Sequence, residues 1–68
     1  MEVSARNNFA GTIKKLEKGP INTEVILEIA PGVEITAIIT KASAEHLKLV
    51  EGGQASAVVK ASDVMIGV

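Results

Sequence analysis

The sequence contains no cysteine, no tryptophan and no tyrosine, and it has a single phenylalanine and a single histidine among 68 residues. Without cysteine the chain can form no disulfide, no thiol nucleophile and none of the usual structural zinc sites. The lone histidine, His46, has no neighbour in sequence that suggests a catalytic pair or a metal cage. We therefore expect a protein that is not an enzyme and that holds no bare metal cation.

Long hydrophobic runs are also missing, because no apolar stretch approaches the roughly 20 residues that span a bilayer. Residues 1–8 are polar and lack the pattern of a secretion signal, so the sequence predicts a cytoplasmic protein without a membrane segment. The formal net charge of −1 argues against a nucleic-acid partner, since such binders normally carry a dominant basic patch.

Aliphatic residues make up most of what is present. The chain is 47% hydrophobic with 1% aromatic residues, so its apolar mass is nearly all Val, Ile, Leu and Ala. A chain of this length has room for one domain, which we place at residues 1–68, and such a domain buries only about 60% of its unfolded surface. Association of several copies would bury the excess, so we expect a homo-oligomer.

Strict alternation of apolar and polar residues predicts a central β-hairpin. Residues 21–30 place Ile, Thr, Val, Leu and Ile at every second position, which is the period of a half-buried strand. The tripeptide Ala30-Pro31-Gly32 follows, in which proline fixes one dihedral angle and glycine accepts a positive one. The second arm, Val33–Thr40, alternates in the same way.

The remaining segments are less regular. Val3–Lys15 predicts a first strand that bulges at Gly11 and is ended by the polar run Lys14–Lys18. After the hairpin, Ser43 as an N-cap predicts a helix of one or two turns through Ala44–Lys48. The turn at residues 51–53 leads to a strand over residues 54–61, and residues 63–67 form a fifth extended piece. This order predicts an all-β fold with one short helix, an OB-like five-stranded β-barrel.

Hydrogen-bond donors and positive charge gather at three places, which is what a metal-free oxyanion site requires. Residues 4–8 contain the only arginine, Arg6; residues 40–43 join a strand end to a helix start; and residues 60–62 follow the fourth strand. Each group also has an ordinary explanation as a solvated charge, a helix cap or an outward lysine. The donor pattern alone leaves both interpretations open.

Four strings carry a resemblance to a known family: SARNNFAG at 4–11, IITKAS at 38–43, LKLVEG at 47–52 and VKASDVMIG at 59–67. Together, in this order and spacing, they resemble the molbindin or Mop domain over nearly the whole chain. The resemblance implies dimers assembled into a hexamer as a trimer of dimers. It also implies storage and buffering of molybdate or tungstate at subunit interfaces, without any other cofactor.

The resemblance further implies which residues hold the oxyanion. The main site, shared between subunits, would be formed by Ser4, Ala5 and Arg6 of one subunit, which face Thr40, Ser43, Lys60, Ala61 and Ser62 of another. A second site on the three-fold axis would be formed by Gly19, Ile21 and Asn22. One arginine and one lysine would balance the charge of a dianion, while hydroxyl and amide groups bond its oxygens.

The alternative function is that of an OB-fold module that binds single-stranded nucleic acid. Such modules stack bases on aromatic side chains along a positive groove, and this chain offers only Phe9 and a slightly negative charge balance. We therefore favour the oxyanion-binding interpretation.

Overall fold

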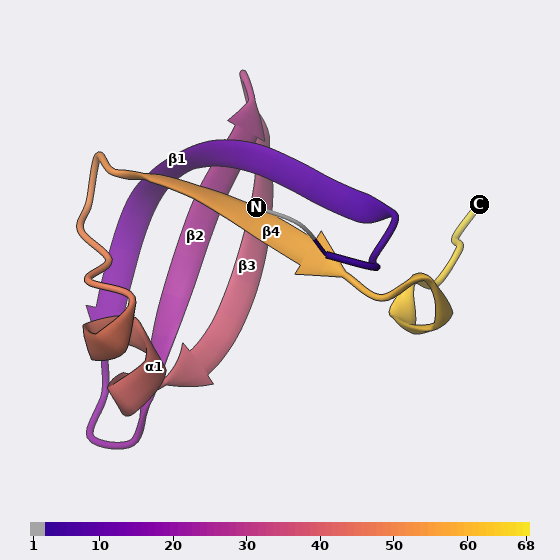
Figure 1. Ribbon diagram of the computed structural model, residues 1–68. Helices are drawn as coiled ribbons and strands as arrows, with labels where there is room; N and C mark the ends of the chain where they lie inside the picture. Colours follow the sequence, from indigo (N-terminus) through magenta and orange to yellow (C-terminus); the bar gives the residue numbers. More distant parts are fainter. Residues whose placement is uncertain (1–2) are drawn as a thin grey trace.

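A computed structural model describes residues 3–68. The elements follow in the order β1 (Asn7–Lys18), β2 (Asn22–Ala30), β3 (Val33–Thr40), α1 (Lys41–His46), β4 (Gln54–Val59) and the 3₁₀ turn η1 (Ala61–Asp63). The strands form one antiparallel sheet in the order β3-β2-β1-β4, which curls into a half-barrel with α1 at one end (Figure 1). The all-β prediction with one short helix is confirmed.

The central hairpin forms as the alternation predicted. In β2, Thr23, Val25 and Leu27 are buried on the concave face, and their β3 partners are Ile39, Ala37 and Ile35. Gly32 has a φ of 75° in the turn between the two strands, a value that glycine adopts without strain. The predicted strand at 21–30 is thus confirmed to within one residue, and the strand at 33–40 is confirmed in full.

Strand β1 departs from its prediction at both ends, since it begins at Asn7 and continues through the polar run to Lys18. The run does not end the strand because a bulge lies within it, where the register shifts between Ile13 and Lys15. The extra residue lets Ile13 and Leu16 face the core together, although they are three positions apart. The predicted bulge at Gly11 is therefore wrong by a few positions.

Gly11 has a different role at the bend of β1. The first half of β1 pairs with β4, and the second half pairs with β2. A Cβ atom on Gly11 would overlap the backbone carbonyl of Glu28 across the sheet. Glycine therefore allows β1 to pass close to β2 where the strand changes partners, which produces the curve visible in Figure 1.

The helix starts earlier than the sequence indicated. Thr40, not Ser43, is the N-cap of α1, and its Oγ1 accepts a hydrogen bond from the Ser43 backbone N–H at 3.0 Å. The predicted helical residues Leu47 and Lys48 lie in the turn that follows. Both threonine and serine are good caps, so the spacing of apolar residues could not decide between two start points three residues apart.

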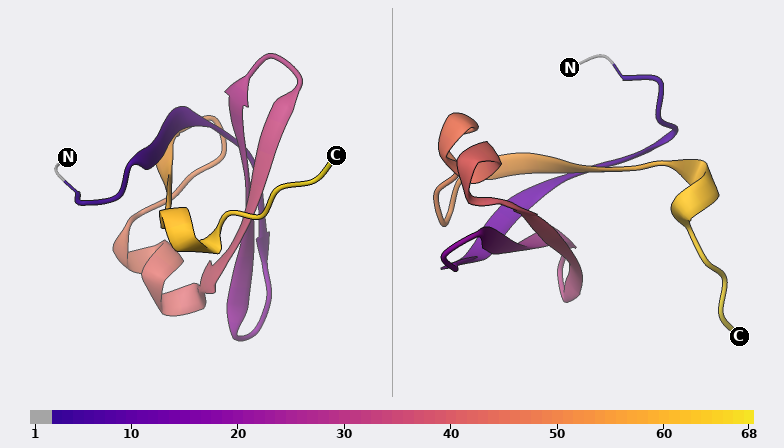
Figure 2. Two further views of the ribbon diagram at one scale, coloured as in Figure 1. Left: turned by 90° about the vertical axis from the view of Figure 1, so that its right-hand side faces the viewer. Right: turned by 90° about the horizontal axis from the view of Figure 1, so that it is seen from below.

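The C-terminal quarter also differs from the prediction. Strand β4 ends at Val59, two residues before the predicted Ala61, because η1 turns the chain there. The expected fifth strand at residues 63–67 is absent: the described sheet has four strands, and Val64–Val68 extends away from it (Figures 1 and 2). The barrel is consequently open between β3 and β4.

The core is small and lies on the concave face. Ile13, Val25 and Leu27 are its buried members, and the half-buried residues around them are Leu16, Ile29, Ile39, Leu49, Ala55 and Ala57. The turn at Glu51-Gly52-Gly53 is confirmed, and it is tied to β1 by two backbone bonds. The Gly52 N–H donates to the Ile13 carbonyl at 2.8 Å, and the Ile13 N–H donates to the Gly53 carbonyl at 2.9 Å. Leu49 packs against the core, whereas Leu47 remains 62% exposed.

Candidate functional site

Six of the predicted main-site residues lie together at one end of the β1–β4 pair. Asn7 and Val59 are the last paired residues of these strands, so Arg6 and Lys60 are the next residues of the two chain segments. Beyond them, the start of the chain and η1 leave this end of the sheet in different directions (Figure 2). We call this group, Ser4, Ala5, Arg6, Lys60, Ala61 and Ser62, the arginine end. In Figure 1 the dark start of the chain and the end of β4, followed by η1, both lie at the right-hand end of the sheet.

The polar side chains of the arginine end are available to a ligand. Ser4, Arg6, Lys60 and Ser62 are exposed, and Ala5 is half-buried. Within the described chain, none of the four makes a side-chain hydrogen bond, and the one recorded salt bridge joins Lys15 and Glu17 elsewhere on β1. The two cations, Arg6 and Lys60, thus follow directly on paired strand ends, where an oxyanion would reduce the repulsion between the charges.

The other five predicted site residues lie together at the opposite end of the molecule, beside α1. Asn22 pairs with Thr40 across β2 and β3, the Lys41 N–H donates to the Ile21 carbonyl at 2.8 Å, and the Gly19 N–H donates to the Asn22 carbonyl at 2.8 Å. We call Gly19, Ile21, Asn22, Thr40 and Ser43 the helix end. Figure 1 and the right-hand view of Figure 2 both separate it from the arginine end along the length of the sheet.

The hydroxyl groups of the helix end are partly occupied by each other. Thr40 Oγ1 donates to Ser43 Oγ at 2.8 Å while it accepts from the Ser43 N–H. Thr40 has therefore used its only hydroxyl proton, and Ser43 Oγ–H is the one donor of the pair that remains for a ligand. Both residues are exposed, as is Asn22.

The resemblance assigns Arg6 and Lys60 to different subunits, whereas one chain already places them next to the paired residues Asn7 and Val59. The main set mixes residues of the arginine end with Thr40 and Ser43 of the helix end, and a single chain does not bring these together. Such a site needs the arginine end of one copy and the helix end of another. Periodicity gives no information on this point, since the strand register decides which segments become neighbours.

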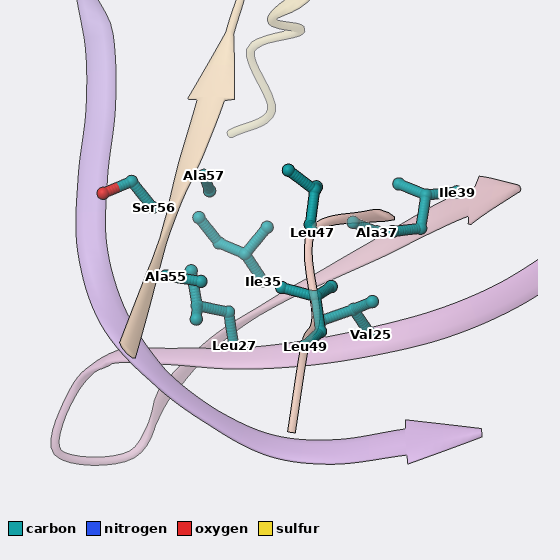
Figure 3. A pocket seen from close by; sticks show the side chains of 10 residues that line it. All are labelled: Val25, Leu27, Ile35, Ala37, Ile39, Leu47, Leu49, Ala55, Ser56 and Ala57. Atoms are coloured by element: carbon teal, nitrogen blue, oxygen red, sulfur yellow. The ribbon is translucent and has the colours of Figure 1, made fainter. Parts of the chain in front are cut away.

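An open apolar groove, which we call the barrel groove, runs along the concave face (Figure 3). It has a volume of about 150 Å³. Its lining comes from β2, β3, β4 and the segment after α1: Val25, Leu27, Ile35, Ala37, Ile39, Leu47, Leu49, Ala55, Ser56 and Ala57. The sequence analysis did not predict this groove. The excess of aliphatic residues in the sequence is the property that could have indicated it.

Other kinds of site find no support in the described residues. Among residues 3–68, no three His, Asp or Glu side chains come close enough to hold a metal ion. No helix over this range has the length and apolar character that crossing a bilayer requires. His46 is exposed in the last turn of α1.

Comparison with known proteins identifies the family. The TOBE domain model matches residues 3–66. Molybdenum-pterin-binding proteins 1 and 2 of Clostridium pasteurianum are each 50% identical over 66 residues, which cover 97% of this chain and 97% of the relative. The chain belongs to the Mop group of TOBE-domain proteins. The family resemblance drawn from the four strings is confirmed.

Solved structures agree with this assignment. MopII from C. pasteurianum superimposes on this Mop domain with a TM-score of 0.93 at 48% identity, covering 98% of this chain and 100% of that one. A molybdate-binding protein from Sporomusa ovata gives 0.91 at 32% identity, with both chains covered in full. The cytoplasmic molybdate-binding protein ModG gives 0.93 at 47% identity, and this Mop domain covers 48% of it. The OB-like fold class is therefore shown.

The same unit also occurs within longer proteins. The molybdenum transport protein ModE of Azotobacter vinelandii is 47% identical over 66 residues, which are 97% of this Mop domain but 24% of that protein. The similarity thus covers a module that works both in short chains and in larger ones.

Proposed function

We propose that this Mop domain binds molybdate, or the closely similar tungstate, and that it stores and releases the oxyanion unchanged in the cytoplasm. The observation that carries the proposal is the arginine end, where Arg6 and Lys60 follow directly on the last residues of the β1–β4 pair. The polar side chains of this group are exposed and have no side-chain partner within the described chain. These groups supply two positive charges and several donors, which suit a dianion whose oxygens only accept hydrogen bonds. Relatives at up to 50% identity are named for molybdenum, and two similar solved structures are molybdate-binding proteins.

The chemistry of these groups favours binding without catalysis. Arg6 and Lys60 hold an anion by charge, and the hydroxyl groups orient it, but none of the six residues is a general base or a nucleophile activated by one. The ModG neighbour is described as cytoplasmic, which supports the location that we propose. Phe9 is the single aromatic residue, and the formal charge is −1, so nothing favours nucleic acid as the ligand.

We further propose that the complete site is shared between copies in a homo-oligomer, a hexamer built as a trimer of dimers. The arginine end and the helix end lie at opposite ends of one chain, so contact between two copies would add Thr40 and Ser43 to the donors around Arg6. The turn that holds Gly19, Ile21 and Asn22 would form the second site on the three-fold axis. An oligomer also explains why the exposed surface holds so many large aliphatic side chains.

The most economical contact between copies is an exchange of the C-terminal segment, Val64–Val68. Met65, Ile66 and Val68 are among the most exposed hydrophobic residues of the chain, and an OB-like barrel lacks one strand here. In extended form, Val64, Ile66 and Val68 would share one face. A segment of about 16 Å could then close the gap between β3 and β4 of a second copy and cover its barrel groove.

Isothermal titration of the purified protein with molybdate, tungstate, sulfate and phosphate tests the ligand. Molybdate and tungstate should bind at least tenfold more tightly than sulfate, because shorter bonds leave some oxygens of sulfate out of reach of fixed donors, at about 1–3 kcal/mol for each lost bond. Phosphate should bind poorly because near neutral pH it carries a proton that a site made only of donors cannot accept. Equal binding of sulfate and molybdate would overturn the proposal.

Engineered cysteines test the exchange, since the natural chain has none to interfere. Ala57→Cys places a thiol in the barrel groove and Ile66→Cys places one on the C-terminal segment. After oxidation of the double variant, denaturing electrophoresis should show covalent dimers and larger covalent species if the segment enters another copy. A covalently closed monomer would show that the segment folds back onto its own chain.

A further inference from the structure

The turn η1 connects the candidate oxyanion site to the C-terminal segment without any residue between them. Lys60 precedes the turn, Ala61 and Ser62 lie in it, and Val64 follows it. Two backbone bonds hold the turn: the Asp63 N–H donates to the Lys60 carbonyl at 2.9 Å, and the Val64 N–H donates to the Ala61 carbonyl at 3.3 Å. No residue of η1 is buried, so core packing does not fix the direction in which the chain leaves β4.

Arg6 lies on the other side of the same site. It precedes Asn7, whose pairing with Val59 anchors this end of β1 to β4. An oxyanion held by Arg6 on one side and by Lys60 and Ser62 on the other would tie the exposed turn to the anchored strand. The ligand would thereby fix the path along which Val64–Val68 leaves the molecule.

We infer that oxyanion binding and exchange of the C-terminal segment are coupled through η1, so that bound molybdate slows the separation of subunits. This inference rests on the proposed function. When the segment is seated in a second copy, the turn holds one conformation and presents Lys60 and Ser62 to Arg6. When the segment is withdrawn, the turn is free to move and the site loses its fixed geometry, so the ligand binds the seated state more tightly.

Coupling of this kind is reciprocal, and reciprocity makes it testable from both sides. If molybdate slows the withdrawal of the segment, then weakening the segment must lower the affinity for molybdate by the corresponding factor. A ligand that only neutralised surface charge would bind both states equally and would not change their ratio.

The effect of molybdate on the separation of subunits can be measured by mixing unlabelled and ¹⁵N-labelled protein and following subunit exchange by native mass spectrometry. Saturating molybdate should slow the exchange at least fivefold, in line with couplings of roughly 5- to 150-fold, while sulfate at the same concentration should leave it unchanged. Equal exchange rates with and without molybdate, in protein that titration shows to be loaded, would overturn the coupling but not the proposed function. Failure of titration to detect molybdate would overturn both.

The effect of the C-terminal segment on the affinity for molybdate can be tested with Ile66→Ala, a substitution outside the candidate site. It should speed subunit exchange and weaken molybdate binding by about fivefold or more, as reciprocity requires. The matched control is Val50→Ala, which removes an exposed aliphatic side chain in the segment between α1 and β4, outside the two open strand edges, and should change affinity by less than about twofold. Faster exchange in Ile66→Ala with unchanged affinity would show that the two processes are independent.

Discussion

Arg6 and Lys60 carry the two positive charges that a dianion would meet at the arginine end, and each reaches the site from a different strand end. Arg6→Ala and Lys60→Ala should each weaken molybdate binding at least tenfold, because a charge-assisted hydrogen bond contributes about 1.5–3 kcal/mol. Titration calorimetry measures the change directly. Circular dichroism on the same samples checks that the fold is retained.

Lys14 provides the matched control for these two substitutions. It is exposed at the bulge of β1 and lies away from both candidate groups. Lys14→Ala removes the same formal charge, but screening by salt should keep the change in affinity within about twofold. If Lys14→Ala and Arg6→Ala weaken binding equally, the attraction is diffuse and the arginine end is not the site.

Gly11 supports a prediction about stability. In Gly11→Ala the new methyl group would overlap the Glu28 carbonyl, and backbone atoms cannot turn aside as a side chain can. We expect a loss of at least about 2 kcal/mol in the free energy of unfolding, measured by urea denaturation. Gly32→Ala meets no atom within 4 Å and carries only the strain of a positive φ, so it should lose about 1 kcal/mol. Equal losses would show that overlap is not what fixes Gly11.

At the scale of single elements, α1 is a short helix whose start depends on one hydroxyl group. Thr40→Ala removes the oxygen that caps the Ser43 N–H and should lower stability by about 1 kcal/mol. Thr40→Ser keeps the oxygen and should lose less than half of that. Thermal unfolding of both variants beside the parent protein decides the point, since equal midpoints for the Ser and Ala variants would contradict the capping role.

The elements also show what could be read from the sequence and what could not. Strands β2 and β3 follow simple alternation and were predicted almost residue by residue. In β1 the alternation breaks at Lys14, and only the pairing of Ile13 with Leu27 and of Leu16 with Val25 reveals that a bulge restores it. A single sequence contains no statement of cross-strand register, so an interrupted pattern looks like the end of a strand.

The C-terminal segment illustrates a second limit. Its alternating aliphatic residues predict a fifth strand, and this prediction is wrong for the described chain, where Val64–Val68 pairs with no strand. The candidate site shows the same limit. Each donor string could be predicted from the sequence, but their division into an arginine end and a helix end follows only from the strand pairing. Asn7 pairs with Val59 at the first end, and Asn22 pairs with Thr40 at the second. Local pattern gives the elements, and the neighbours of each element depend on contacts between distant residues.

At the scale of the whole molecule, large aliphatic side chains are exposed both on the strands and, in greater number, in the segments outside them. We expect sedimentation equilibrium at micromolar concentration to give a hexamer, with dimers as the smallest stable species. Ile66→Asp places a charge where the segment would be buried, and it should shift the distribution to smaller species. A parent protein that sediments only as a 7.1 kDa species would contradict the assembly and the shared site together.

The divided pairing of β1 has a consequence for how the chain folds. Strands β1, β2 and β3 are joined by tight turns and can find each other through local contacts, whereas the first half of β1 must wait for β4 from the far end of the chain. We therefore expect strands β1, β2 and β3 to form the folding nucleus, and β4 to dock late in folding. Val25→Ala should slow refolding in stopped-flow experiments, while Val59→Ala should mainly accelerate unfolding. During synthesis, residues 7–11 would remain an unpaired edge until β4 is made, and the polar pair Asn7-Asn8 makes that edge less prone to aggregate.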